Sequence, residues 1–171
     1  ENSDIVRRMS DLLLEQETKK LKDEPIVETA KTHLELPIQG AIPKKYIASD
    51  KHRMDAYRRL SRASSMEQFD AVVASITDAF GDPPPPARTL FDVAEVRLAA
   101  TRHRIDKLKL EGPDLIFTTA KAEKLRPLFD TAPGRATVLD ETTLYWRPPP
   151  NYLEPESLLP ILRKLLVRPL R

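Results

Sequence analysis

The chain has 171 residues, a length that suits one domain or one domain with an ordered extension. Its 28 Lys and Arg residues nearly balance 26 Asp and Glu residues, so the net charge of +2 is far from that of a dedicated nucleic-acid binder. The absence of cysteine excludes disulfides, thiol nucleophiles and thiolate metal sites. The four glycines lie far apart and form neither a P-loop nor a dinucleotide-binding fingerprint. A nucleotide-binding domain is therefore not expected.

Residues 1–31 are expected to form a helical connector. Within them a single apolar stripe (Ile5, Met9, Leu12 and Leu13) runs into a polar, helix-forming stretch, and such a stripe needs a partner surface. The chain lacks a starting Met, a basic leader and an apolar run long enough to span a bilayer. We therefore expect a cytoplasmic piece of a longer protein, with no membrane contact.

Residues 32–47 are predicted to be extended, because Pro37 and Pro43 prevent a continuous helix. A helix is predicted next, over residues 50–61. Its expected core face consists of Met54, Tyr57 and Leu60.

The second predicted helix has the clearest boundaries. It begins at Ser64 or Ser65, since each has a capping-box partner three residues later, and it ends at Gly81. Its apolar positions follow the helical period closely: Phe69, Val72, Val73, Ile76 and Phe80. A third helix, over residues 87–103, follows a run of four prolines, and its expected core residues are Leu90, Phe91, Ala94 and Leu98.

The hydrophobic period then changes from that of helices to that of strands. Two hairpins are predicted, one from residues 105–110 and 115–118 and one from residues 136–139 and 142–146, with a short helix over 122–129 between them. The chain closes with an amphipathic helix that carries Leu158, Leu159, Ile161, Leu162, Leu165 and Leu166. The predicted fold class is α+β: N-terminal helices, then a small antiparallel sheet with crossing helices and a C-terminal amphipathic helix.

No constellation of catalytic residues is visible. His33, His52 and His103 lie far apart, and none has metal-ligand spacing to another histidine. There is no nucleophile elbow, and the adjacent Asp140 and Glu141 are expected to point apart at a turn. We therefore nominate no catalytic, cofactor-binding or metal-binding residue, and a stand-alone enzyme is the remotest hypothesis.

Charge is segregated along the chain. Residues 41–62 hold seven basic and two acidic side chains, whereas residues 63–95 hold one basic and six acidic side chains. Such segregation suits docking between protein surfaces, or equally two solvated helices that attract each other. As an alternative function, the basic helix is expected to contact nucleic-acid phosphates through Lys44, Lys45, Arg53, Arg58 and Arg59.

The second helix places Asp78 opposite its core face. The small residues Ala71, Ala74 and Ser75 flank it, and together they would form a flat strip that another surface can approach closely. An ordinary solvated helix back is the alternative interpretation.

Five segments of the chain form a recognisable collinear set: HLELPI (33–38), AIPKKYI (41–47), YRRLSRA (57–63), ITDAFG (76–81) and PARTLFDVAEVRL (86–98). Together they resemble the C-terminal domain of the bacterial transcription-repair coupling factor. The similarity is collinear over residues 33–105 and looser beyond. The resemblance implies that residues 32–171 are this domain and that residues 1–31 connect it to an upstream translocase motor.

Coupling factors are ATP-driven DNA translocases that displace stalled RNA polymerase and recruit the repair protein UvrA. The resemblance implies that ATP and Mg²⁺ bind the motor and that this fragment has neither cofactor nor catalysis. It also implies that the domain docks on the N-terminal UvrB-like module of the same protein, which masks UvrA binding and restrains the motor. Asp78 occupies the position of an acidic docking residue in the family, whereas Ser75 replaces a glutamate whose role Asp70 or Asp82 would have to assume.

Overall fold

The computed structural model describes residues 31–171, so the predicted helical connector lies outside the described residues except for Lys31. The described chain forms two compact units. The first unit consists of Gln39–Ala94. The second unit consists of residues 31–38 together with Glu95–Arg171. A single helix, α4 (Pro85–Arg102), contributes its residues up to Ala94 to the first unit and the rest to the second.

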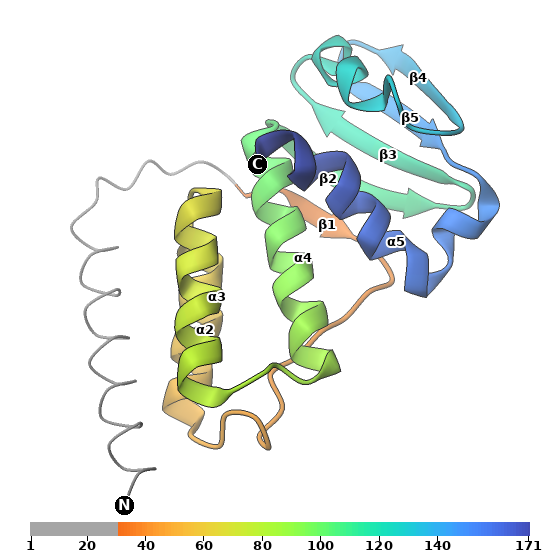
Figure 1. Ribbon diagram of the computed structural model, residues 1–171. Helices are drawn as coiled ribbons and strands as arrows, with labels where there is room; N and C mark the ends of the chain where they lie inside the picture. The colour runs from red at the N-terminus through yellow and green to blue at the C-terminus, as the bar shows by residue number, and fades with distance from the viewer. Residues whose placement is uncertain (1–30) are drawn as a thin grey trace, which may run out of the picture. The chain divides into compact units, whose positions relative to one another are not determined.

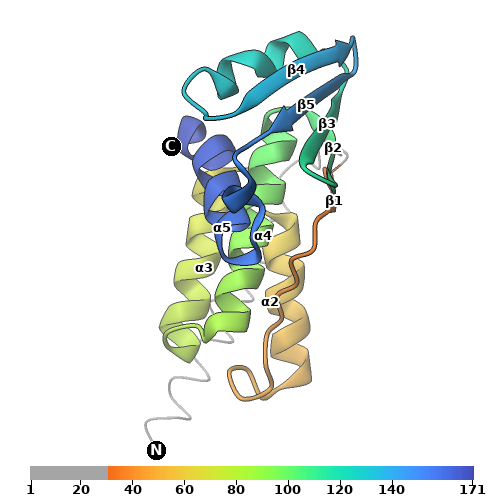
Figure 2. The same cartoon turned by 90° about the vertical axis from the view of Figure 1, so that its right-hand side faces the viewer.

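The first unit is helical. Helices α2 (Asp50–Arg62) and α3 (Met66–Phe80) pack side by side (Figure 2), and both lie within a few residues of their predicted bounds. Their core includes Ile42, Ile47, Ala56, Leu60, Phe69, Val72, Ile76, Ala87 and Phe91.

The ends of α3 confirm the predicted capping signals. The hydroxyl oxygen of Ser65 accepts the Gln68 N–H at 3.1 Å, so Ser65 rather than Ser64 is the N-cap. The Gln68 side-chain oxygen accepts the backbone N–H of Ser64 at 3.0 Å. At the other end Gly81 has φ +86°, a conformation that side chains disfavour, and its N–H donates to the Thr77 carbonyl at 2.8 Å.

The predicted core face of α2 is wrong at two of its three positions. Met54 is 60% exposed and Tyr57 is 36% exposed, although Leu60 is buried. The helix instead buries the face that carries Ala56, Arg59 and Leu60 and leads to Ala63. Ala56, Leu60 and Ala63 follow the i, i+4, i+7 spacing of one helix face, whereas Met54, Tyr57 and Leu60 are three residues apart and drift by about 60° at each step. The packing of the unit selects the stripe that begins at Ala56.

Helix α4 begins at Pro85, two residues earlier than predicted, because a proline fits the first turn of a helix. Its start lies against the chain at Gly40, where a Cβ atom would come within 2.2 Å of the Leu90 backbone nitrogen. Of its expected core residues Phe91 and Leu98 are buried, but Leu90 and Ala94 are only half-buried.

The second unit contains a five-stranded sheet in the order β1-β2-β3-β5-β4 (Figure 1). Both predicted hairpins are present, and every pairing is antiparallel except that of β1 with β2. The strands are β1 (His33–Glu35), β2 (Ile105–Glu111), β3 (Asp114–Thr119), β4 (Arg135–Asp140) and β5 (Thr143–Arg147). The sheet and its helices confirm the predicted α+β class.

The short helix predicted between the hairpins is the 3₁₀ helix η1 (Ala122–Phe129), which packs on strands β3, β4 and β5 of the sheet. The Phe129 ring contacts Phe117 and Trp146 at centroid distances of 5.4 and 5.6 Å. The buried Trp146 indole N–H donates to the Pro133 carbonyl at 3.0 Å. Aromatic packing of this kind favours a fixed geometry as well as burial.

The C-terminal amphipathic segment is not one regular helix. After η2 (Pro150–Leu153) it comprises α5 (Pro155–Leu162), a π-helical turn at Arg163–Val167 and η4 (Arg168–Leu170). The predicted apolar residues are buried except Ile161, which is half-buried. Glu95, with a side chain only 7% exposed, accepts hydrogen bonds from Arg163 (2.7 Å) and Arg171 (2.9 Å) and so ties α4 to this segment.

Candidate docking surface on α3

The exposed side of α3 carries acidic and small side chains. Its buried side consists of Phe69, Val72 and Ile76. The predicted residues on the opposite side are exposed, and we call them the acidic strip: Asp70, Ala71, Ala74, Asp78 and Asp82, the last just beyond the helix end. The structure therefore brings together five of the six predicted docking residues.

The C-terminal end of the acidic strip concentrates negative potential. Asp78 lies in the last turn of α3, Asp82 follows the helix, and the last turn contains no basic residue. The helix dipole also places partial negative charge at this end, so carboxylates there are unfavourable by about 0.3–1 kcal/mol each. Within residues 31–171 no ion pair involves either carboxylate. A cationic partner surface would relieve this repulsion.

Tyr46 packs at the same end of α3. Its hydroxyl donates to the Gly81 carbonyl at 2.7 Å, and its ring meets Phe80 edge-on at 6.1 Å. Burial first, and then the negative charge of Asp82, raises the pKa of Tyr46. The tyrosine therefore stays protonated at neutral pH and holds the backbone where Asp82 leaves the helix.

Ser75 is not part of the exposed strip. It is half-buried, and its hydroxyl oxygen accepts a hydrogen bond from Arg59 Nη2 on α2 at 3.1 Å. The position at which the resemblance predicts a glutamate thus faces a neighbouring helix in this chain. A docking contact through Ser75 would require this contact to open.

Arg59 cannot contact phosphate in this structure, which corrects that prediction. The residue is 1% exposed, and burial lowers its pKa to about 10, a value at which it is still protonated at neutral pH. Arg59 lies on the same helix face as Ala56 and Leu60, and the predicted core face of Met54, Tyr57 and Leu60 placed it outside the core.

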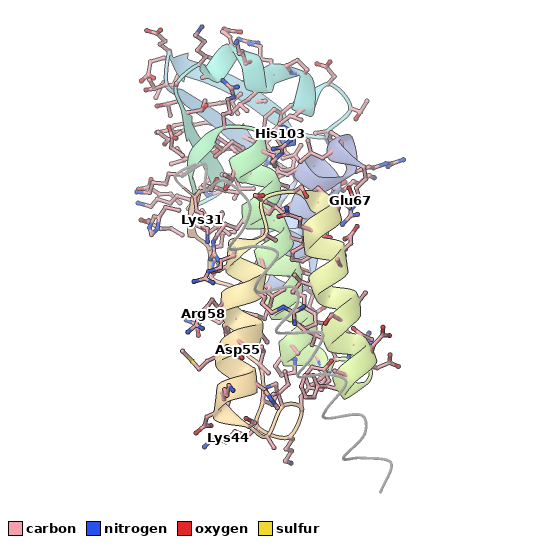
Figure 3. The ribbon with its side chains drawn as sticks, turned by 90° about the vertical axis from the view of Figure 1, so that its left-hand side faces the viewer. Lys31, Lys44, Asp55, Arg58, Glu67 and His103 are labelled. Carbon is pink, nitrogen blue, oxygen red and sulfur yellow. The ribbon has the colours of Figure 1, made fainter. Side chains whose placement is uncertain are left out.

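Arg53 is also directed inward, with a side chain only 16% exposed. Its guanidinium donates to the Ile47 and Ala48 carbonyls at 3.1 and 3.3 Å and pairs with Asp50. The remaining phosphate candidates, Lys44, Lys45 and Arg58, are exposed, and Figure 3 labels Lys44 and Arg58.

The histidines take ordinary structural positions. The His33 ring lies 3.2 Å from a Glu35 carboxylate oxygen, and His103 Nε2 lies 2.8 Å from the Leu166 carbonyl. In the part of the chain that the structure describes, no three His, Cys, Asp or Glu side chains are placed to hold a metal ion. Nor does any helix among residues 31–171 combine the length and apolar character needed to cross a bilayer.

Comparison with known proteins identifies the class of domain. The TRCF domain model matches residues 36–128, which is more than half of the chain. A solved crystal structure of the C-terminal domain of transcription-repair coupling factor shares the fold, with a TM-score of 0.63, 16% identity, and coverage of 81% of this chain and 94% of that one.

The chain therefore belongs to the TRCF domain family. Its relatives include transcription-repair-coupling factors. This chain is 39% identical to the Mycobacterium tuberculosis protein over 105 residues, which is 61% of this chain. It is 32% identical to the Escherichia coli protein over 96 residues, which is 56% of this chain. The match to the Bacillus subtilis protein is 27% over 114 residues (67% of this chain). The matched segments span only 8% to 10% of these relatives. Together with the family model and the solved structure that shares the fold, they identify this chain as the C-terminal domain of a transcription-repair coupling factor.

Proposed function

We propose that this chain is a regulatory domain that docks on the N-terminal UvrB-like module of its parent protein. Docking would cover the UvrA-binding surface of that module and restrain the DNA translocase until stalled RNA polymerase is engaged. The observation that carries this proposal is the exposed acidic strip of α3, with Asp78 in the last turn. Its partner would present Arg or Lys side chains to that end of the helix.

The docking is expected to be weak and reversible. Asp78 and Asp82 are solvent-exposed, so an ion pair with either contributes roughly 0–1 kcal/mol, and more only if docking removes water from it. In the parent protein the two domains share one chain, and the resulting effective concentration can hold a weak contact closed. A contact of this strength can be released by a competing partner.

The substitution at Ser75 weakens the docking relative to the family pattern. A charged glutamate would add a charge-assisted contact, whereas Ser75 is engaged with Arg59 at 3.1 Å. Asp82, or Asp70 earlier on the strip, would supply the missing carboxylate. Their positions at the two ends of the strip would shift the partner along α3.

In this proposal the rest of the parent protein carries out catalysis. ATP and Mg²⁺ would bind the upstream motor, and RNA polymerase, UvrA and DNA would be engaged by the parent in the cytoplasm. The described residues would act only through protein contacts.

The proposal is tested by the substitution Asp78→Arg in the full-length parent protein. Release of the docking should raise both the affinity for UvrA and the basal rate of ATP hydrolysis. Asp130→Arg is the matched control, because Asp130 is exposed in the other unit and undergoes the same charge change. If Asp78→Arg altered neither quantity, the acidic strip would not be the docking surface.

A further inference from the structure

The outward face of α2 exposes an unusual set of side chains. Among the described residues three large hydrophobic side chains are exposed, and two of them, Met54 and Tyr57, lie on this helix. The third, Leu139, is isolated on strand β4. Two adjacent exposed apolar side chains on one helix face are more informative than a single one.

Arg58 completes the centre of this face. At 100° per residue, Met54 lies between Tyr57, 60° to one side, and Arg58, 40° to the other. The Tyr57 hydroxyl oxygen accepts the Ile42 N–H at 2.9 Å, which fixes its ring. Arg58 reaches Asp55 only at 3.4 Å, at the outer limit of a hydrogen bond, and Figure 3 shows Arg58 on the side of α2 away from α3.

Further basic side chains lie along this face and before it in the chain. Lys51 lies one turn before Met54, Arg62 lies one turn after Arg58, and Lys44 and Lys45 lie in the segment that precedes the helix. All four are exposed, and within residues 31–171 no ion pair involves any of them. The face thus has an apolar centre and a cationic rim.

This arrangement favours a protein partner over nucleic acid. Met, Tyr and Arg are enriched at the centres of protein–protein interfaces, whereas lysine is depleted there and belongs to the rim. A phosphate-binding face would instead place its cations at the centre of the contact. Exposed Met54 offers nothing to a phosphate, but it can fill a gap in an apolar surface.

We propose that the α2 face formed by Met54, Tyr57 and Arg58 is a second docking surface, which binds an acidic amphipathic helix of a partner protein. Apolar residues of that helix would cover Met54 and Tyr57. Its flanking carboxylates would pair with Arg58, Lys51 and the rest of the cationic rim. This surface is separate from the acidic strip and opposite to it in charge.

The test uses the whole chain and a synthetic probe. The probe is an 18-residue helical peptide with leucine on one face and glutamate on both flanks. Two matched peptides carry either lysine in place of glutamate or serine in place of leucine. The chain contains three methionines, so the ¹³C-methyl signal of Met54 can be assigned with Met54→Leu and followed directly during titration.

We expect saturable binding of the glutamate–leucine peptide that shifts the Met54 methyl signal, and at least tenfold weaker binding of each matched peptide. Met54→Asp and Arg58→Glu should each weaken binding at least tenfold. Arg126→Glu, an equal charge change at an exposed position in the other unit, should not. Asp78→Arg should also leave it unchanged, which separates this proposal from docking through the acidic strip.

The proposal would be overturned if no saturable binding of the glutamate–leucine peptide were seen up to millimolar concentration. It would also be overturned if the serine peptide bound equally well, or if Arg58→Glu did not weaken binding. A 20-base-pair duplex DNA that competes with the peptide and binds more tightly, with a steep loss on adding salt, would assign the face to nucleic acid instead.

Discussion

Glu95 offers a direct test of how the second unit is held together. Its buried carboxylate accepts one hydrogen bond from Arg163 and one from Arg171. A hydrogen bond to a charged group contributes about 1.5–3 kcal/mol when well shielded. The two arginine side chains are 44% and 38% exposed, so water screens both pairs and competes for the guanidinium groups. We therefore expect Glu95→Ala to lower the free energy of unfolding by about 2 kcal/mol.

Thermal unfolding followed by the fluorescence of Trp146 measures this effect, because the only tryptophan of the chain lies in the core of the same unit. A loss of about 2 kcal/mol corresponds to a drop in Tm of roughly 4–8 °C for a domain of this size. Glu123→Ala is the control, since it removes an exposed pair with Arg126 that is worth less than about 0.5 kcal/mol. Equal effects of the two substitutions would refute the inference that Glu95 fastens the C-terminal segment.

Three further substitutions test the fold. Ser65→Ala should lower the free energy of unfolding by about 1 kcal/mol through loss of the α3 cap, and an unchanged urea midpoint by circular dichroism would contradict this. Gly40→Ala should destabilise more strongly, because its Cβ would clash with the Leu90 backbone; thermal denaturation at the wild-type Tm would refute that. A hydrogen bond from Arg147 lowers the pKa of Asp114 below 3.8. Asp114→Asn should therefore lower the free energy of unfolding at pH values above 3.8. This difference from the wild type should disappear as the pH falls through the lowered pKa. A difference in urea midpoint that persisted below that pKa would contradict this assignment.

The elements predicted most accurately are those specified by local signals. Helix α3 has a capping serine, a regular apolar period and a terminal glycine, and the structure places Ser65 and Gly81 in those roles. The hairpins follow from alternating residues and short turns, and Glu111 and Asp114 pair at the end of the first. In each case the residues that decide the structure are neighbours in sequence.

What the sequence could not show depends on contacts between distant segments. Strand β1 pairs with β2 across some seventy residues, and the buried Thr32 hydroxyl fixes it by donating to the Ile105 carbonyl at 2.5 Å. Likewise the choice between two apolar stripes on α2 is made by the packing of the unit. That choice buried Arg59 and exposed Met54, so it changed the predicted phosphate site and revealed the second candidate surface.

The acidic strip was predictable in outline because exposure on a well-defined helix follows from its period. Asp78 is exposed as expected, with Ala71 and Ala74 beside it. The inward position of Ser75 was not predictable, because it depends on the Arg59 side chain that reaches it from α2.

The most direct test of the central claim is the dissociation constant of this chain for the purified N-terminal UvrB-like module of the same organism's coupling factor. We predict saturable binding that Asp78→Arg weakens about tenfold, a change of about 1.4 kcal/mol, while Asp130→Arg leaves it unchanged. Absence of binding at millimolar concentrations, or equal affinities for the wild type and Asp78→Arg, would contradict the account.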